Sequence, residues 1–474
     1  MKPAVAAVSL GLVALWSLAP PPGAGAAPTP GAPPTPAAAA PAAVTASAIA
    51  FPFPVAERTL PNGLHVYVVK FDSPGLVAYY SVVRVGSRNE VEPGKSGFAH
   101  FFEHMMFRGT DRYPQAAYND EIKKMGADSN AFTSDDLTVY HILAGKAALP
   151  KMIELESDRF ANLKYKEPEF QKEARAVLGE YNKSASDPLQ KMFEALLDNA
   201  FTKHTYKHTT IGFLKDIEDM PNQFAHSLSF FDRYYRPDNV TLVVAGDVIA
   251  DEVFPLIENA YGSWKKGPAR PAIAAEPAQL KEKRAALTWK GPTLPILLEG
   301  WHAPGFSTSN VDLQALDVLA ELVFSERAPL YKRLVITEQK VQALSGSYDT
   351  HVDPNLFSVL ARIKKPEDLG YVEKAIDDEI GRIAREGVDE KTLRDVLSNV
   401  RYSFAARLST ADRVATTAAQ FIALGGVIDV INSYYAQYPK VTSTDVQRVA
   451  GGIFKPQNRT VVTMVSQGAK EGGK

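Results

Sequence analysis

The chain of 474 residues contains no cysteine. This absence excludes disulfide bonds, thiolate metal sites and cysteine nucleophiles together. It also excludes a lipid anchor, which needs a cysteine after the signal peptide. The stability of the folded protein must therefore come from its hydrophobic core.

The sequence also has no large excess of positive or negative charge. The formal net charge is −2, and the sequence holds no basic cluster and no glycine-rich phosphate loop. These absences argue against nucleic acid as a partner. With 45% hydrophobic and 22% charged residues, the composition is that of a globular protein long enough for two or three domains.

The first 50 residues differ in composition from the rest. A positively charged start precedes an apolar stretch, Ala4 to Leu18, which has the length of a signal-peptide core and is short for a membrane span. Ala24–Gly25–Ala26 has the small-residue pattern of a cleavage site. We therefore expect residues 1–26 to be a signal peptide and residues 27–50, mostly Ala, Pro, Thr and Gly, to be a disordered spacer. The mature protein would be periplasmic or secreted without a stable membrane anchor, and an uncleaved anchor is the alternative.

Hydrophobic periodicity divides the remaining chain into two halves, residues 51–264 and 293–474, joined by a Lys-, Pro-, Ala- and Glu-rich linker over 265–292. In the first half we expect a hairpin over 57–71, strands over 76–87, 126–145 and 239–248, and helices over 97–109, 116–125, 149–163, 168–184 and 250–261. In the second half we expect strands over 294–304, 355–363 and 459–467, and helices over 311–324, 369–385 and 390–408. The similar size and order of the two halves indicate a duplicated α+β architecture.

The stretch GFAHFFEHMMFRGT, residues 97–110, places three polar groups in an apolar helix. His100, Glu103 and His104 share one helical face because their spacing is i, i+3 and i+4. The other positions are largely apolar, which predicts a buried helix. Burying these groups without partners would cost roughly 2–7 kcal/mol each. A divalent metal would compensate that cost by binding both imidazoles and leaving the carboxylate beside a bound water.

A structural role is the alternative, because a buried histidine more often bonds to a backbone carbonyl than to a metal. The pattern His-x-x-Glu-His is uncommon in a chain with only nine histidines, which favours the metal. Ser96 is the expected N-cap of this helix and Gly109 its expected stop.

A catalytic zinc site needs a third protein ligand. The helix EPEFQKEARAVLGEYNKSASD, residues 167–187, offers Glu173 and Glu180, which lie on one face because seven residues make about two turns. On spacing alone, a solvated charged face is the alternative. Gly179 in this helix costs roughly 1 kcal/mol relative to Ala, and close approach of the histidine helix would explain it.

These motifs resemble those of the pitrilysin and insulysin family of zinc metallopeptidases, the inverzincins. Glu180 follows His104 by 76 residues, and the Glu173–Glu180 pair matches the second motif of the family. The resemblance implies that His100, His104 and Glu180 bind one Zn²⁺ per chain. It further implies that Glu103 is the general base. Glu173 would not bind the metal itself but would support the residues that do.

The segment NAFTSDDLTVY, residues 130–140, resembles the segment of the family that lies beside the site. The resemblance implies that Asn130 and Ala131 lie on an edge strand that binds the backbone of a peptide substrate by strand addition. It also implies an α+β fold of two similar domains, each with helices packed on an antiparallel-rich sheet, that forms one half of a clam-like chamber. The resemblance covers residue 51 to the end of the chain.

Active members of the family usually present an Arg and a Tyr, seven residues apart, that stabilise the developing oxyanion. In residues 325–348, no Tyr follows Arg327 or Arg333 at that distance, and the glycine-rich loop of the family's non-catalytic mitochondrial subunits is missing too. The resemblance therefore predicts an exported zinc endopeptidase that acts on peptides or unfolded segments. It would be the zinc-bearing half of a two-subunit enzyme, similar in plan to the mitochondrial processing peptidase, with a homologous partner supplying the Arg–Tyr pair. The alternatives are a homodimer that uses another donor, such as Arg333, and a non-catalytic peptide-binding or scaffold subunit.

Overall fold

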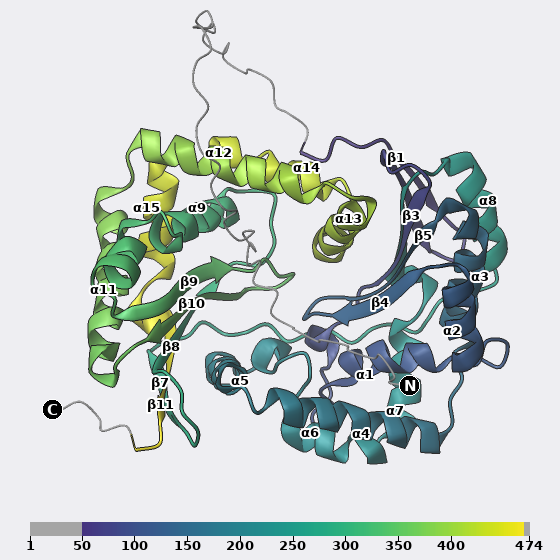
Figure 1. Cartoon of the computed structure of the whole chain (residues 1–474), viewed down its shortest axis with the longest axis horizontal. Coiled ribbons are helices and arrows are strands. Elements are labelled where there is room, and N and C mark those ends of the chain that lie inside the picture. Colours follow the sequence, from purple (N-terminus) through teal and green to yellow (C-terminus); the bar gives the residue numbers. More distant parts are fainter. Residues whose placement is uncertain (1–49, 469–474) are drawn as a thin grey trace, which may run out of the picture.

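The computed structural model describes residues 50–468, which form two α/β halves with one sheet each (Figure 1). The predicted signal peptide and all but the last residue of the predicted spacer lie outside the described residues.

The first half contains a six-stranded sheet with the order β1-β2-β6-β3-β5-β4. Its strands are β1 (Val55–Thr59), β2 (His65–Lys70), β3 (Leu76–Val83), β4 (Asp128–Thr133), β5 (Thr138–Gly145) and β6 (Val240–Gly246). Its helices are α1 (Phe98–Met105), α2 (Gln115–Lys124), α3 (Leu149–Asn162), α4 (Glu167–Ser184), α5 (Pro188–Ala200), α6 (Leu214–Asp219), α7 (Phe224–Tyr234) and α8 (Ala250–Tyr261).

The second half contains a five-stranded sheet with the order β7-β11-β8-β10-β9. Its strands are β7 (Lys283–Trp289), β8 (Ile296–Ala303), β9 (Val341–Tyr348), β10 (Asn355–Ile363) and β11 (Arg459–Ser466). Its helices are α9 (Asp312–Phe324), α10 (Pro329–Tyr331) with a π-helical turn over Lys332–Thr337, α11 (Leu369–Glu386), α12 (Glu390–Arg407), α13 (Ala411–Gly425), α14 (Val430–Tyr435) and α15 (Ser443–Ile453).

Both sheets are rich in antiparallel pairs, which confirms the predicted fold class. Each sheet has one parallel pair, β2 with β6 and β7 with β11. Strand β6 lies inside the first sheet, and all seven of its residues are buried. Its β-branched residues suit such a position, because branched side chains pack well on a pleated surface.

The prediction of a linker over residues 265–292 is wrong for its second part, where Lys283–Trp289 forms β7. This strand lies at the edge of the second sheet, and its side chains alternate between exposed and half-buried. An edge strand of this kind carries charged residues and buries little apolar surface, so its composition resembles that of a linker.

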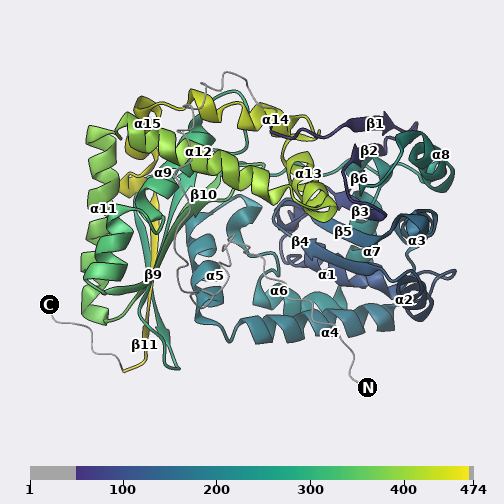
Figure 2. The same cartoon turned by 45° about the horizontal axis from the view of Figure 1, so that its top comes forward.

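Each sheet is covered on one face by a helix from the other half (Figures 1 and 2). Helix α13 packs on β3 and β6 of the first sheet, where the Tyr80 hydroxyl donates to Asp412 over 2.7 Å. Helix α5 packs on β7, β8 and β11 of the second sheet, and its Leu196 lies in one cluster with Leu298. The two halves therefore share their hydrophobic cores.

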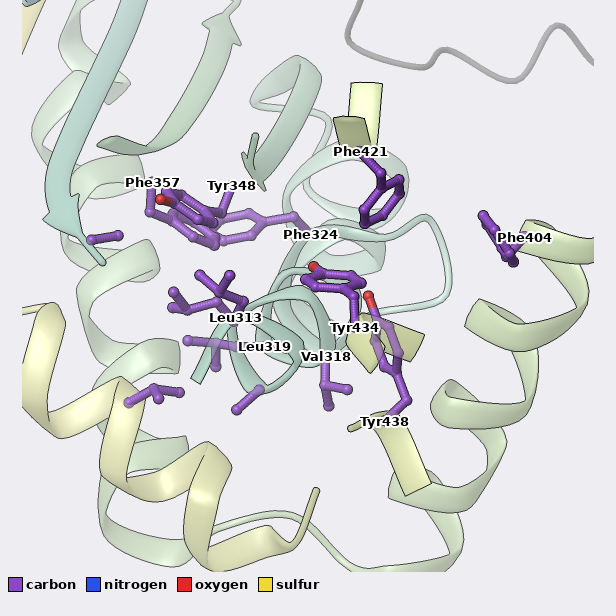
Figure 3. Close-up of a cluster of buried hydrophobic side chains, with 14 of the residues drawn as sticks. Leu313, Val318, Leu319, Phe324, Tyr348, Phe357, Phe404, Phe421, Tyr434 and Tyr438 are labelled. Atoms are coloured by element: carbon purple, nitrogen blue, oxygen red, sulfur yellow. The ribbon is translucent and has the colours of Figure 1, made fainter. Parts of the chain in front are cut away.

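The larger core belongs to the second half and extends onto the first sheet. Figure 3 shows part of it around α9, with Leu313, Val318 and Leu319 beside the rings of Phe324 and Tyr434. Within residues 50–468, no single helix is long and apolar enough to cross a membrane; the bent pair Ala411–Gly425 and Val430–Lys440 passes that test by length and composition.

Candidate metal centre

Helix α1 lies between strand β4 and helix α4 in both views (Figures 1 and 2). Its N-cap is Gly97, with a φ of 93°, and not Ser96 as the sequence predicted. The Ser96 hydroxyl is used elsewhere, because it donates to Asp216 over 2.6 Å and accepts from the N–H of Phe213. The aromatic face of α1 packs against α4, with the rings of Phe101 and Phe170 5.0 Å apart.

His100, His104 and Glu180 converge between α1 and α4. One ligand atom from each residue lies within 4.8 Å of the other two. Glu180 Oε2 is 3.2 Å from His100 Nε2 and 3.4 Å from His104 Nε2. Burial acts to raise the pKa of Glu180, but the two neighbouring imidazoles outweigh it and hold the pKa at about 2.

These three residues suit a divalent cation. His104 Nε2 is buried, yet it makes no hydrogen bond to any residue in the described part of the chain. A buried nitrogen of this kind costs free energy unless something binds it. Two imidazole nitrogens and one carboxylate oxygen are the donor set of a common class of catalytic zinc sites.

Glu173 fixes the orientation of His104. Its Oε1 lies 3.1 Å from His104 Nδ1, and its Oε2 accepts from Arg108. The Nδ1–H of His104 therefore donates to Glu173, so that Nε2 presents its lone pair to the cluster. Arg108 was not among the predicted residues, although its i+4 spacing from His104 places it on the same helical face.

Glu103 lies beside the three residues and is not one of them. Only 6% of the residue is exposed, and its Oε2 makes no hydrogen bond within residues 50–468. This oxygen is 3.5 Å from His100 Nδ1. Burial acts to raise the pKa of Glu103, but the neighbouring His100 outweighs it, so the pKa lies below its ordinary value and the carboxylate is ionised.

Asn130 and Ala131 lie on β4, at the edge of the first sheet. Among residues 50–468, β4 pairs with β5 alone, where Ala131 is opposite Tyr140. The N–H of Ala131 donates to the Asn130 side chain over 2.9 Å. A peptide added to this edge would replace that bond with one of its own.

Two further positions bear on the sequence analysis, Gly179 and Tyr348. A Cβ placed on Gly179 would meet no described atom within 4 Å, so close approach of α1 does not explain this glycine. Tyr348, the tyrosine that follows Arg333, is buried and its hydroxyl donates to the carbonyl of Pro304. It is therefore held within the second half, while Arg333 lies on the π-helical turn near Glu338.

A two-domain α+β protein with a His₂Glu cluster between a short and a long helix has the features of a metallopeptidase half. The comparisons with known proteins identify the family. The family described as Insulinase (Peptidase family M16) matches residues 76–212, and the Peptidase M16 inactive domain matches residues 224–400. The chain belongs to peptidase family M16.

Three similar proteins illustrate the relationship. The zinc protease PqqE of Helicobacter pylori is 28% identical over 85% of this chain and 91% of its own. The mitochondrial-processing peptidase subunit beta of Caenorhabditis elegans is 27% identical over 56% of each chain. The crystal structure of the periplasmic protease PqqL from Escherichia coli is 20% identical with a TM-score of 0.74, and the match covers 89% of this chain and 48% of that one.

Proposed function

We propose that the protein is an exported zinc endopeptidase that hydrolyses peptides or unfolded protein segments. The observation that carries this proposal is the convergence of His100, His104 and Glu180 around a buried imidazole nitrogen with no other partner among the described residues. Family M16 and the zinc protease name of the Helicobacter relative support it.

Zinc bound by these residues would supply a Lewis acid that polarises a peptide carbonyl and lowers the pKa of a water to about 7. Glu103 is placed to take the proton of the attacking water, because its free oxygen belongs to a buried, ionised carboxylate beside His100. Glu103 then gives that proton to the leaving amine. The free edge of β4, at Asn130 and Ala131, would hold the substrate backbone in an extended form.

We further propose that the chain works as one half of a two-subunit chamber. It matches about half the length of the Escherichia coli protease, and a relative is named as a subunit of the mitochondrial processing peptidase. The Arg–Tyr pair that active members present is missing from residues 325–348. A homologous partner would supply the pair; the alternative is a homodimer in which Arg333 serves instead.

A non-catalytic peptide-binding subunit is the other function that the fold supports. Residues 224–400 match the family's inactive domain, and the described residues of the second half form no metal cluster like that of the first. The first half nevertheless keeps both histidines, the third carboxylate and Glu103. We therefore favour the catalytic function.

Metal content tests the proposal. We expect one zinc per chain in the purified wild-type protein and a large loss in His104→Ala, measured by elemental analysis. His65→Ala is the matched control, because His65 lies on β2 and contacts Thr59 instead of the cluster. Equal zinc in wild type and His104→Ala would contradict the site.

A further inference from the structure

The N-terminus of helix α1 has no capping side chain of its own. Its N-cap, Gly97, has a φ of 93°, which side chains rarely tolerate. A Cβ at this position would also lie 2.6 Å from the carbonyl oxygen of Ile211. The residues that usually cap helices, Ser, Thr, Asp and Asn, therefore cannot occupy the position.

The side chain of Glu90 supplies the missing cap. Its Oε2 accepts from the N–H of Gly97 and its Oε1 from the N–H of Ala99, each over 2.7 Å. The first N–H groups of a helix have no partner within the helix, and they carry the positive end of its dipole. A carboxyl group with one oxygen on each of two such N–H groups fixes the start of the helix at two points, and the second point is the residue next to His100.

The ionisable groups around Glu90 have other hydrogen-bond partners, so the Glu90 side chain is available to cap the helix. The side chain is fully buried. Two ionisable groups act on it: His208, whose Nε2 lies 3.8 Å from Oε2, and Asp216, whose charge acts to raise the pKa of Glu90. His208 Nδ1 lies 3.0 Å from the carbonyl of Thr209, so it carries the proton, and burial lowers the pKa of this imidazole and keeps it neutral. Asp216 accepts hydrogen bonds from the N–H and the hydroxyl of Ser96, the residue before Gly97. Burial raises the pKa of Glu90 to about 8, while the bonds from the helix N–H groups act to lower it.

We propose that Glu90 is a positioning residue of the metal centre: it sets the position and rotation of α1, and through them the direction of His100 and Glu103. This inference rests on the proposed zinc function. Glu90 touches none of the three residues that would bind the metal, so its effect acts through the helix.

Zinc affinity measures this role directly. In Glu90→Gln, an amide NH₂ replaces one accepting oxygen, so one helix N–H loses its acceptor. We expect the zinc dissociation constant to rise about 10- to 100-fold, the range typical of residues that orient metal ligands. Glu90→Asp keeps both carboxyl oxygens but is one methylene shorter, and we expect a smaller rise than with Gln. Competition with a chromogenic chelator gives the constants, and thermal unfolding shows that each variant is folded.

Glu299→Gln is the matched control. Glu299 is also a fully buried glutamate, on β8 in the second half, and burial raises its pKa to about 8 as well. A rise for Glu90→Gln with little change for Glu299→Gln supports the proposal. A dissociation constant within twofold of wild type in Glu90→Gln overturns it, and so does an equal rise in both variants.

Two further outcomes have distinct meanings. Where Glu90→Gln does not fold, Glu90→Asp takes its place. Failure of both to fold, while Glu299→Gln folds, would overturn the inference and assign Glu90 to folding as a whole. A wild-type protein that binds no zinc would contradict the proposed function itself.

Discussion

At the scale of single residues, the candidate centre depends on side chains that would not touch the metal. Glu173 accepts from His104 Nδ1 and is itself held by Arg108. Without this pair the imidazole could rotate or take the other tautomer, and its free nitrogen would no longer face Glu180. The sequence revealed Glu173 through its spacing from Glu180. It did not reveal Glu90, because a loop separates that residue from the helix and only the fold defines the path of that loop.

His351 gives the protein a pH-dependent stability. It lies in the second half, 3.1 Å from Asp136 and 3.7 Å from Asp135 of the first half, with Asp349 nearby. Burial alone would lower its pKa, but these carboxylates outweigh burial and raise the pKa to about 9. Since the folded pKa exceeds the unfolded value of about 6.5, the stabilisation is fully present below pH 6.5 and is lost as the pH rises through 9.

We expect wild type to be more stable than His351→Gln at pH 6.5, by an amount on the order of 3 kcal/mol that shrinks toward pH 10. Chemical unfolding of both proteins across this pH range measures the difference. A difference that does not change with pH would show that His351 is not charged in the folded state. His65→Gln, at a half-buried site where the imidazole lies 3.1 Å from the Thr59 hydroxyl, controls for the loss of a histidine.

At the scale of secondary-structure elements, the sequence predicted those whose pattern is local. Helix α1 and helix α4 carry regular apolar spacing, and the hairpin of β1 and β2 carries an Asn62–Gly63 turn, so each was placed to within a few residues. Helices α5 and α13 were not predicted. Each buries its apolar face on the sheet of the other half, and no local pattern reveals so distant a partner.

The sequence also did not predict that α1 begins with Gly97 as its N-cap. A serine before a helix normally predicts the N-cap. Here Ser96 binds Asp216, and the helix begins after Gly97 because that residue has a φ of 93°, outside the right-handed helical region. The donor residues of the cluster could be predicted from spacing and family resemblance, whereas the contacts that orient them could not.

The proposed role of the edge strand β4 in substrate binding can be tested at Ala131. The N–H of Ala131 faces away from β5, since it is held by the Asn130 side chain. Ala131→Pro removes this N–H without removing a bond between β4 and β5, which is why proline is tolerated at such edge positions. We expect KM to rise about 3- to 10-fold, the equivalent of one hydrogen bond of roughly 1 kcal/mol, with zinc content unchanged.

Steady-state kinetics on a peptide substrate, with elemental analysis of the same sample, measures this effect. Unchanged KM in the zinc-loaded variant would remove the Ala131 N–H from substrate binding. A fall in zinc content or in thermal stability would show that the substitution disturbs β4 itself.

At the scale of the whole molecule, the exchange of α5 and α13 makes the two halves one folding unit. Each sheet lacks cover on one face until the other half is in place. The polar contacts between the halves add to this, with Arg88 of the first half bound to Asp353 of the second. The candidate metal centre in the first half therefore depends on a second half whose described residues form no metal cluster of their own.

In the proposed two-subunit chamber, a partner chain would complete the enclosure of the substrate. We expect low peptidase activity from the isolated chain and an increase of about 10²–10³-fold on mixing with a homologous chain that carries the Arg–Tyr pair, which is the effect of an oxyanion-stabilising donor. Full activity of the isolated chain, unchanged by the partner, would defeat the two-subunit account. Activity that rises with the chain's own concentration, together with a dimer in size-exclusion chromatography, would favour the homodimer.

The central claim is that Glu103 is the base of a zinc peptidase, and one comparison tests it most directly. Peptidase activity and zinc content are measured on the same samples of wild type and Glu103→Gln, each mixed with the partner chain. The account predicts equal zinc and a loss of activity of at least 10²–10⁴-fold in the variant, because the amide cannot take the proton from water. Full activity in a zinc-loaded Glu103→Gln protein would contradict it.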